Sequence, residues 1–229
     1  MSSIASHKVR VGEHELHYLE AGSGPPVLLL HGWPTNAQLW RHVLPALAPK
    51  RRAIALDLPG FGQSDKPTDV RYNFGFFERT LSGFFDALGI DRVGLAVHDL
   101  GGPVGLYWAA KHRERVSDLA ILNTLAFPEP SAAVVAFVAA TYIPGLRSWL
   151  TSPAGIRFSM RFGVERKERI DEETTRLYTD PYPDRSSRQA LLKSAQGLSP
   201  RGLSTIAESL TDFSMPVRIL YGERGCILL

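Results

Sequence analysis

The sequence predicts an α/β protein whose mostly parallel sheet has helices on both faces and is interrupted by an inserted helical segment. Short apolar runs, typical of buried strands, alternate with helical patterns as far as residue 126. Such alternation is typical of βαβ units. It breaks at Phe127 and resumes near Pro216. We therefore expect a core over residues 1–126, a helical cap over 127–213 and a return to the core over 214–229.

Apolar periodicity defines the individual elements. Alternating residues on either side of Gly12 predict an antiparallel hairpin over His7–Val11 and His14–Glu20. Further strands are expected at Pro26–Leu30, Arg52–Asp57, Arg92–His98, Val116–Asn123 and Pro216–Tyr221. Helices are expected at Gln38–Leu47 (inward face Trp40, Val43, Leu44 and Leu47), Phe74–Leu88 and Gly101–His112. Gly89 stands where a left-handed residue commonly ends a helix.

The composition narrows the class of protein. Hydrophobic residues make up 44 % of the 229 residues and charged residues 21 %, which are ordinary globular values. The net charge of +3 includes no basic block, so nucleic-acid binding is not expected. The lone Cys226 excludes an intrachain disulfide and a thiolate zinc site. The start lacks a secretory pattern, and the longest apolar stretch, Ser131–Tyr142, is too short to span a bilayer. A cytoplasmic protein without membrane partners is therefore expected.

The strongest chemical signal is the sequence VHDLGG at residues 97–102, between a predicted strand and a predicted helix. A small–x–nucleophile–x–Gly turn at such a junction is a nucleophile elbow, and glycines leave room for its tight bend. The bend raises Asp99 at the carboxyl end of the sheet and aims the Leu100 N–H at the reacting group. The alternative is that Asp99 is an ordinary helix N-cap.

An aspartate at this position predicts covalent catalysis. A carboxylate attacks an sp3 carbon and forms an ester, which water then hydrolyses. The sequence HGWP at 31–34 directly follows a buried strand. Gly32 allows the backbone to turn, so the Trp33 N–H is expected to face the Leu100 N–H and complete an oxyanion hole. His31 is expected to hold the loop rather than act as a base. The carboxylates of the turn at 57–67 are expected to be turn formers.

Three motifs together resemble a known family. HGWPTNAQLWRHVLPALA, DLPGFGQSDKP and AVHDLGGPVGL, in this order and spacing, resemble haloalkane dehalogenases and their close relatives in the α/β-hydrolase superfamily. The resemblance extends from Val9 to about Glu223. It implies the α/β-hydrolase fold, Asp99 as nucleophile, a small apolar haloalkane as substrate and water as the second substrate. It implies no metal or organic cofactor.

The resemblance does not determine which leaving group the substrate carries. Val97 and the YTDPYPD run at 178–184 resemble dehalogenases. Dehalogenases usually carry tryptophan after the nucleophile, but here Leu100 has no side-chain donor. Trp33 is a halide donor or an apolar wall of the pocket, and Trp149 is a second donor or a packing residue.

Epoxide hydrolase is the alternative chemistry within the superfamily. In that family, tyrosines of the cap protonate the opening oxygen. Tyr142, Tyr178 and Tyr182 are the candidates, and each is otherwise a packing residue.

The resemblance also predicts catalytic partners that the sequence does not supply. The ester needs a histidine base held by a second carboxylate. Asn123, which we place in the substrate pocket, and Gly225 occupy the two positions where the family carries that acid, and no histidine follows His112. We therefore expect a truncated chain that lacks the last strand and helices of the fold, with a persistent ester. An exposed sheet edge would favour self-association. A non-catalytic remnant or binding protein is the third alternative.

Overall fold

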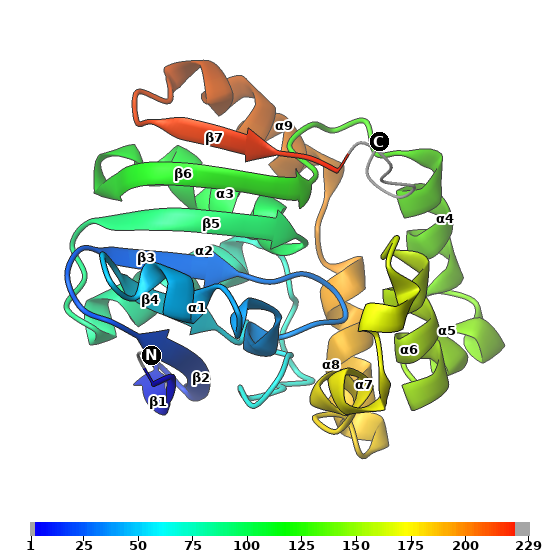
Figure 1. Ribbon diagram of the computed structural model, residues 1–229. Helices are drawn as coiled ribbons and strands as arrows, with labels where there is room; N and C mark the ends of the chain where they lie inside the picture. The colour runs from blue at the N-terminus through cyan, green and yellow to red at the C-terminus, as the bar shows by residue number, and fades with distance from the viewer. Residues whose placement is uncertain (1–2, 223–229) are drawn as a thin grey trace.

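A seven-stranded sheet organises residues 3–222, the part of the chain that the computed structural model describes (Figure 1). The strands are β1 (Ala5–Val11), β2 (His14–Ala21), β3 (Pro26–Leu30), β4 (Arg52–Leu56), β5 (Val93–Asp99), β6 (Val116–Thr124) and β7 (Val217–Leu220). Their order in the sheet is β1-β2-β4-β3-β5-β6-β7. β1 and β2 form the predicted antiparallel hairpin, and β2 pairs antiparallel with β4. The other pairs are parallel, which confirms a mostly parallel sheet.

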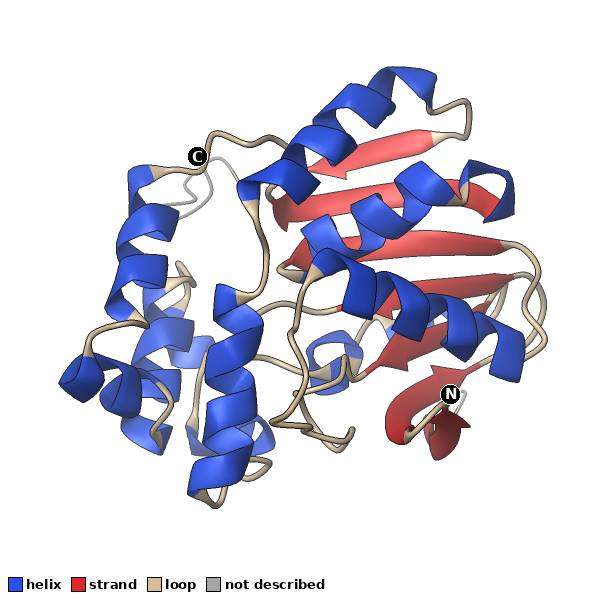
Figure 2. Cartoon of the chain, turned by 180° about the vertical axis from the view of Figure 1, so that it is seen from behind, coloured by secondary structure: helices blue, strands red, loops and turns tan. Residues whose placement is uncertain are grey.

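Two buried clusters, one on each face, hold the sheet. Leu28 and Leu30 of β3 join the cluster that includes α2 (Phe74–Ala87), α3 (Gly101–Lys111) and α9 (Pro200–Ser209). Val27 and Leu29 join the other, with η1 (Ala37–Trp40) and α1 (Leu44–Leu47). Successive side chains of a strand point to opposite faces, so a strand covered on both sides reads as a continuous apolar run. Helices cover both faces, as predicted, and Figure 2 shows the face with the longer ones.

The helix predicted over Gln38–Leu47 is interrupted. The structure has a 3-10 turn at Ala37–Trp40, then a turn, and then a short α-helix at Leu44–Leu47. Pro45 has no N–H to donate to the Arg41 carbonyl, so a continuous helix cannot run through it, and α1 begins with proline in its first turn. Trp40 and Leu44 are buried as predicted, but Val43 is 37 % exposed.

Five helices in succession lie beyond the carboxyl ends of the parallel strands (Figure 1). They are α4 (Ala132–Ala140), α5 (Pro144–Leu150), α6 (Pro153–Phe162), α7 (Glu172–Thr179) and α8 (Arg185–Gln196). Side chains of Ser131, Ser152, Asp171 and Asp184 cap the N-termini of α4, α6, α7 and α8. α9 packs against α3, so we propose that the inserted segment ends before α9 rather than at residue 213.

α4 and α5 are strongly apolar helices of this segment. α4 has no buried residue, and Val135 on it is 52 % exposed. Within residues 3–222 no single helix is long and apolar enough to cross a bilayer, although α4 and α5 together meet that test by length and composition with a bend of 104° between them.

β7 forms one edge of the sheet in the described residues. Its apolar side chains are open to solvent, with Ile219 68 % exposed and Leu220 51 % exposed. An unpaired strand edge with apolar side chains is a surface on which a strand of another chain can pair. Self-association through this edge stays a prediction.

Candidate active site

Asp99 stands on a sharp turn between β5 and α3. Its backbone φ is +50°, in the left-handed region that costs energy for a residue with a side chain. The hydroxyl of Thr124, on the neighbouring strand β6, donates to the Asp99 carbonyl oxygen at 2.5 Å. The sharp turn expected from VHDLGG is therefore present, and a hydrogen bond from the adjacent strand stabilises its strained apex.

The Asp99 carboxylate faces the loop that follows β3. Its Oδ1 accepts a hydrogen bond of 2.7 Å from the backbone N–H of Trp33. α3 begins at Gly101 without a side-chain cap, so Asp99 is not the N-cap of that helix. The Leu100 N–H, the second expected donor, forms no hydrogen bond with the carboxylate in the described part of the chain. Of the two expected donors, Trp33 is the one in contact.

Three glycines make room for this arrangement. A Cβ at Gly32 would lie 2.2 Å from the Asp99 Cβ and Oδ1. At Gly101 it would lie 2.4 Å from the His31 carbonyl oxygen, and at Gly102 1.6 Å from the Thr124 hydroxyl. Glycine is needed at 101 and 102, as expected, but the reason is that the His31 carbonyl and the Thr124 side chain lie against these positions. Gly32 is required for a reason that the sequence did not reveal, since its neighbour is the Asp99 side chain itself.

His31 holds the loop that carries Trp33. Its Nδ1 donates to the Gly32 carbonyl at 3.0 Å, and its Nε2 accepts from the Leu58 N–H at 3.1 Å. The side chain is fully buried, and burial lowers the pKa of the imidazole below its ordinary value of 6.5. Neutral His31 with the proton on Nδ1 satisfies both bonds, which agrees with the structural role expected for it.

Asp57 holds the same loop from its other end. Its buried carboxylate accepts from the backbone N–H of Ala37 at 2.6 Å and of Gln63 at 2.7 Å, which makes it the turn former that the sequence predicts. His17 Nδ1 lies 2.7 Å from Asp57 Oδ2, and His17 Nε2 lies 2.9 Å from the Ser6 hydroxyl. This chain of contacts was not predicted, because it joins β1, β2 and β4 across the sheet edge.

His98 is the histidine nearest to Asp99 in sequence. Its Nδ1 is buried without a hydrogen-bond partner, and burial lowers the pKa of its ring. The ring meets Trp40 edge-on with centroids 6.4 Å apart. Within residues 3–222 no histidine forms a hydrogen bond with the Asp99 carboxylate.

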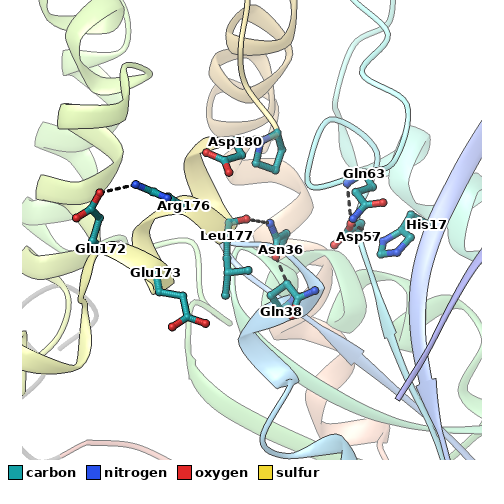
Figure 3. Close-up of a pocket in the computed structure, with 11 residues that line it drawn as sticks. His17, Asn36, Gln38, Asp57, Gln63, Glu172, Glu173, Arg176, Leu177 and Asp180 are labelled. Atoms are coloured by element: carbon teal, nitrogen blue, oxygen red, sulfur yellow. Dashed lines mark hydrogen bonds and ion pairs between the residues drawn. The ribbon is translucent and has the colours of Figure 1, made fainter. Parts of the chain in front are cut away.

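A cavity lies between Asn36 and α7 (Figure 3). Its volume is about 670 Å³, and it separates Asn36, Asp57 and Gln63 from the polar face of α7. Asp99 does not line it. Within residues 3–222 no group of three or more His, Cys, Asp or Glu side chains is arranged to hold a metal ion.

Comparison with known proteins decides the family. Residues 25–151, more than half of the chain, match the family described as the alpha/beta hydrolase fold. The chain belongs to the alpha/beta hydrolase family. This family assignment agrees with the mostly parallel sheet and with the turn at Asp99, which follows the fifth strand in chain order.

Relatives within the alpha/beta hydrolase family carry two activities. The haloalkane dehalogenase of Agrobacterium fabrum is 33 % identical over 199 residues, which are 84 % of this chain and 65 % of that protein. The soluble epoxide hydrolase of Corynebacterium sp. is 38 % identical over 146 residues, which are 58 % of this chain and 49 % of that protein. The matched part of the chain thus spans 49 % and 65 % of the length of these two curated relatives.

Solved alpha/beta hydrolase structures show the same two kinds of neighbour. The haloalkane dehalogenase DbeA from Bradyrhizobium elkani superimposes with a TM-score of 0.83 at 26 % identity, covering 96 % of this chain and 81 % of that one. The epoxide hydrolase CorEH superimposes with a TM-score of 0.80 at 25 % identity, covering 96 % and 83 % of the two chains.

The expected pocket residues Trp33, Trp149 and Asn123 each contact another part of the chain. The Trp33 indole N–H donates to the Leu191 carbonyl of α8 at 3.1 Å, so this donor is already engaged. Trp149 of α5 is 40 % exposed and packs on Phe158, with ring centroids 5.2 Å apart. Asn123 lies one residue before the end of β6, and its Oδ1 accepts from the Gly222 N–H at 3.1 Å.

The candidate tyrosines differ in exposure and in the residues they contact. Tyr142 is 61 % exposed. Tyr178 is buried with its hydroxyl 3.4 Å from Arg41 Nη1. Tyr182 is buried beneath Lys66, whose ammonium lies 5.6 Å from the ring, and its hydroxyl has no hydrogen-bond partner. Gly225 and Cys226, which we singled out in the sequence, lie outside the described residues.

Proposed function

We propose that this alpha/beta hydrolase is of the haloalkane dehalogenase type, with Asp99 as its nucleophile. One carboxylate oxygen attacks an sp3 carbon that bears a halogen. The new C–O bond forms as the carbon–halogen bond breaks, and the halide leaves with the bonding electron pair. The product is an alkyl ester of Asp99. Water then attacks the ester carbonyl carbon, which releases the alcohol and restores the carboxylate.

The contact between the Trp33 N–H and Asp99 Oδ1 carries this proposal. When Oδ2 attacks, Oδ1 becomes the carbonyl oxygen of the ester, and negative charge develops on it when water adds. A donor that is already in place stabilises that charge without reorganisation. The left-handed φ of Asp99 supports the same conclusion, because strain of this kind is common at functional positions.

The surroundings of Trp33 support a small, largely apolar substrate. The ring of Phe137, from α4, lies 4.7 Å from the Trp33 ring and places an apolar surface beside the loop. The two activities of the relatives, on haloalkanes and on epoxides, both concern electrophilic sp3 carbons. The haloalkane is favoured because the dehalogenase relative matches a larger share of this chain.

The leaving halide receives little help from the side chains singled out. Leu100 has no donor, and the Trp33 indole N–H is bonded to Leu191. We therefore expect reactivity to follow the intrinsic quality of the leaving group, with iodide and bromide leaving faster than chloride.

Epoxide hydrolysis is the second candidate, supported by the epoxide hydrolase relative and structural neighbour. Ring opening needs an acid for the alkoxide, and a cap tyrosine is the expected donor. Tyr178 faces Arg41 and Tyr182 packs below Lys66, and neither forms a hydrogen bond with Asp99. These placements rank the epoxide second.

Hydrolysis of the ester needs a base, and within residues 3–222 no histidine forms a hydrogen bond with the Asp99 carboxylate. His17 is paired with Asp57, His31 with the backbone of its own loop, and His112 with Glu78. We propose that the ester of the 229-residue chain persists long enough to be isolated. A non-catalytic binding protein is the remaining candidate, and it would form no ester.

Intact-mass measurement of the 229-residue chain after incubation with 1-bromobutane and with styrene oxide separates these candidates. A butyl adduct alone supports the dehalogenase type, a styrene oxide adduct alone supports the epoxide hydrolase type, and neither adduct supports the binding protein. Asp99→Asn should abolish the adduct, whereas Asp91→Asn, an exposed aspartate, should keep it. Hydroxylamine treatment identifies the linkage, because it cleaves an ester on Asp99 but not a thioether on Cys226.

A further inference from the structure

One short loop connects the nucleophile to three helices of the inserted segment. Trp33 and Asn36 lie three positions apart in the sequence, and both use their side chains to bond helices beyond the sheet. We infer that Trp33 and Asn36 are positioning residues, which make the placement of the oxyanion donor depend on the docking of α4, α7 and α8. This inference rests on the proposed role of the Trp33 N–H.

Asn36 bonds the loop to α7 (Figure 3). Its Nδ2 donates to the Leu177 carbonyl at 2.8 Å, and its Oδ1 accepts from the Gln38 N–H at 3.0 Å. The carbonyl of Leu177 would normally accept from the residue four positions later, but that residue is Pro181, which has no N–H. Asn36 therefore satisfies a carbonyl that the helix cannot satisfy itself. Its side chain is 3 % exposed, so the bond is shielded from water.

Trp33 bonds the loop to α8 and packs it on α4. Its indole N–H donates to the Leu191 carbonyl at 3.1 Å, and its ring lies 4.7 Å from that of Phe137. The backbone N–H of the same residue donates to Asp99 Oδ1. A displacement of α8 or α4 that moves the indole must therefore rotate or shift the peptide that carries the donor.

The sheet side of the loop is fixed independently. Asp57 holds the Ala37 N–H, and His31 bridges the Gly32 carbonyl and the Leu58 N–H. The loop is therefore held at both ends by the core, and residues 33–36 between these ends are held by the inserted helices. Loss of the helix bonds should loosen this middle part without unfolding the core.

The test compares Asn36→Asp with Asn73→Asp. Aspartate keeps the Oδ1 acceptor that caps η1 but replaces the donor to Leu177 with a second acceptor. Asn73 is a matched control: it caps α2 through Oδ1 on the Phe76 N–H and bonds no inserted helix. Trp33→Phe removes the indole donor and keeps an aromatic ring against Phe137.

Hydrogen–deuterium exchange is the first readout, because it needs no chemistry. We expect faster exchange in α7 and at the Trp33 amide in Asn36→Asp, and in α8 and at the Trp33 amide in Trp33→Phe. Asn73→Asp should exchange as the parent chain does at all of these sites. Unchanged exchange at the Trp33 amide in both loop variants overturns the inference.

The second readout is the rate of Asp99 alkylation as a function of 1-bromobutane concentration. Asn36→Asp should lower the limiting rate about tenfold, because a displaced Trp33 N–H no longer orients the Asp99 carboxylate for attack, with a smaller change in the half-saturating concentration. Faster exchange with an unchanged limiting rate also overturns the inference. If the parent chain is never alkylated, the proposed function fails. Exchange at the Trp33 amide then tests alone whether the position of the donor depends on the inserted helices.

Discussion

The backbone N–H of Trp33 and the Oδ1 of Asp99 are joined by a 2.7 Å hydrogen bond, although 66 residues separate them in the sequence. The bond brings the loop after β3 against the turn after β5, which are neighbouring strands of the parallel sheet. A donor and a carboxylate thus meet at the carboxyl end of the sheet, where open α/β sheets bind ligands. The predictions below follow from the residues that create and hold this contact.

Gly32→Ala should abolish alkylation of Asp99. The new Cβ would lie 2.2 Å from the Asp99 Cβ, so the loop and the carboxylate must separate and the Trp33 donor is lost. Displacement of a reacting group by about 1 Å costs about 100-fold in rate, and we expect at least that loss in the accumulation of the butyl adduct because the Asp99 carboxylate itself is displaced. Gly145→Ala is the matched control, because a Cβ there meets no atom within 4 Å. A Gly32→Ala chain that folds and reacts at the parental rate would contradict the account.

Thr124→Val should destabilise the fold while leaving the shape of the side chain almost unchanged. The Thr124 hydroxyl bonds the carbonyl of the strained Asp99, and the side chain is 3 % exposed. The loss of a buried hydrogen bond costs about 1–3 kcal/mol in the free energy of unfolding. Urea titration measures it, and Thr124→Ser, which keeps the hydroxyl, should retain most of the stability. Equal stability of the valine and parental chains would exclude the bond as a support of the turn.

The free energy of unfolding should fall as the pH drops below the ordinary histidine value. Burial lowers the pKa of His31 and of His98 below 6.5 in the folded chain. Below pH 6.5 these two histidines bind protons in the unfolded chain but stay neutral in the folded chain. The folded chain therefore has its full stability above the unfolded-state pKa, and it loses stability as the pH falls towards the folded-state pKa.

Urea titrations between about pH 5 and pH 8 measure this dependence. His31→Gln should give a shallower pH dependence than the parental chain, because one of the two buried groups is gone. Stability that rises as the pH falls through this range would show that the buried rings are stabilised as cations instead.

Asp57→Asn should loosen the loop from the core side. Asparagine has a single side-chain acceptor oxygen, and an NH2 group replaces the second oxygen. The Asp57 carboxylate uses both oxygens to contact Ala37, Gln63 and His17. Disruption of a buried charged network costs about 3–5 kcal/mol, which thermal unfolding would report as a lower melting temperature. Asp69→Asn, at an exposed position, is the control. A melting temperature equal to that of the control would contradict the role given to Asp57.

The elements that local chemistry specifies were predictable from the sequence. PVLLL forms β3 as expected from its continuous apolar run. The sharp turn predicted at Asp99 is also present, although the atoms that exclude a side chain at Gly101 and Gly102 belong to the distant residues His31 and Thr124. The prediction of one helix over Gln38–Leu47 was wrong because it rested on the apolar periodicity and gave too little weight to Pro45. The missing N–H of Pro45 prevents a continuous helix at this position.

The contacts that make the site were less predictable, because they depend on distance through space. The Trp33 indole could be predicted as a donor or a wall, but its partner is a backbone carbonyl 158 residues away, which no side-chain pattern encodes. Asn36 was missed for the same reason. Pro181 is a signal that marks an unpaired carbonyl at Leu177, although it does not say which residue satisfies it.

Tandem mass spectrometry of the peptide that contains residue 99, after incubation with 1-bromobutane, tests the central claim most directly. The account predicts a butyl group on the Asp99 carboxylate, removed by hydroxylamine and absent from Asp99→Asn. An unmodified Asp99 in a folded chain, with butyl found only on Cys226 or on other carboxylates, would contradict it.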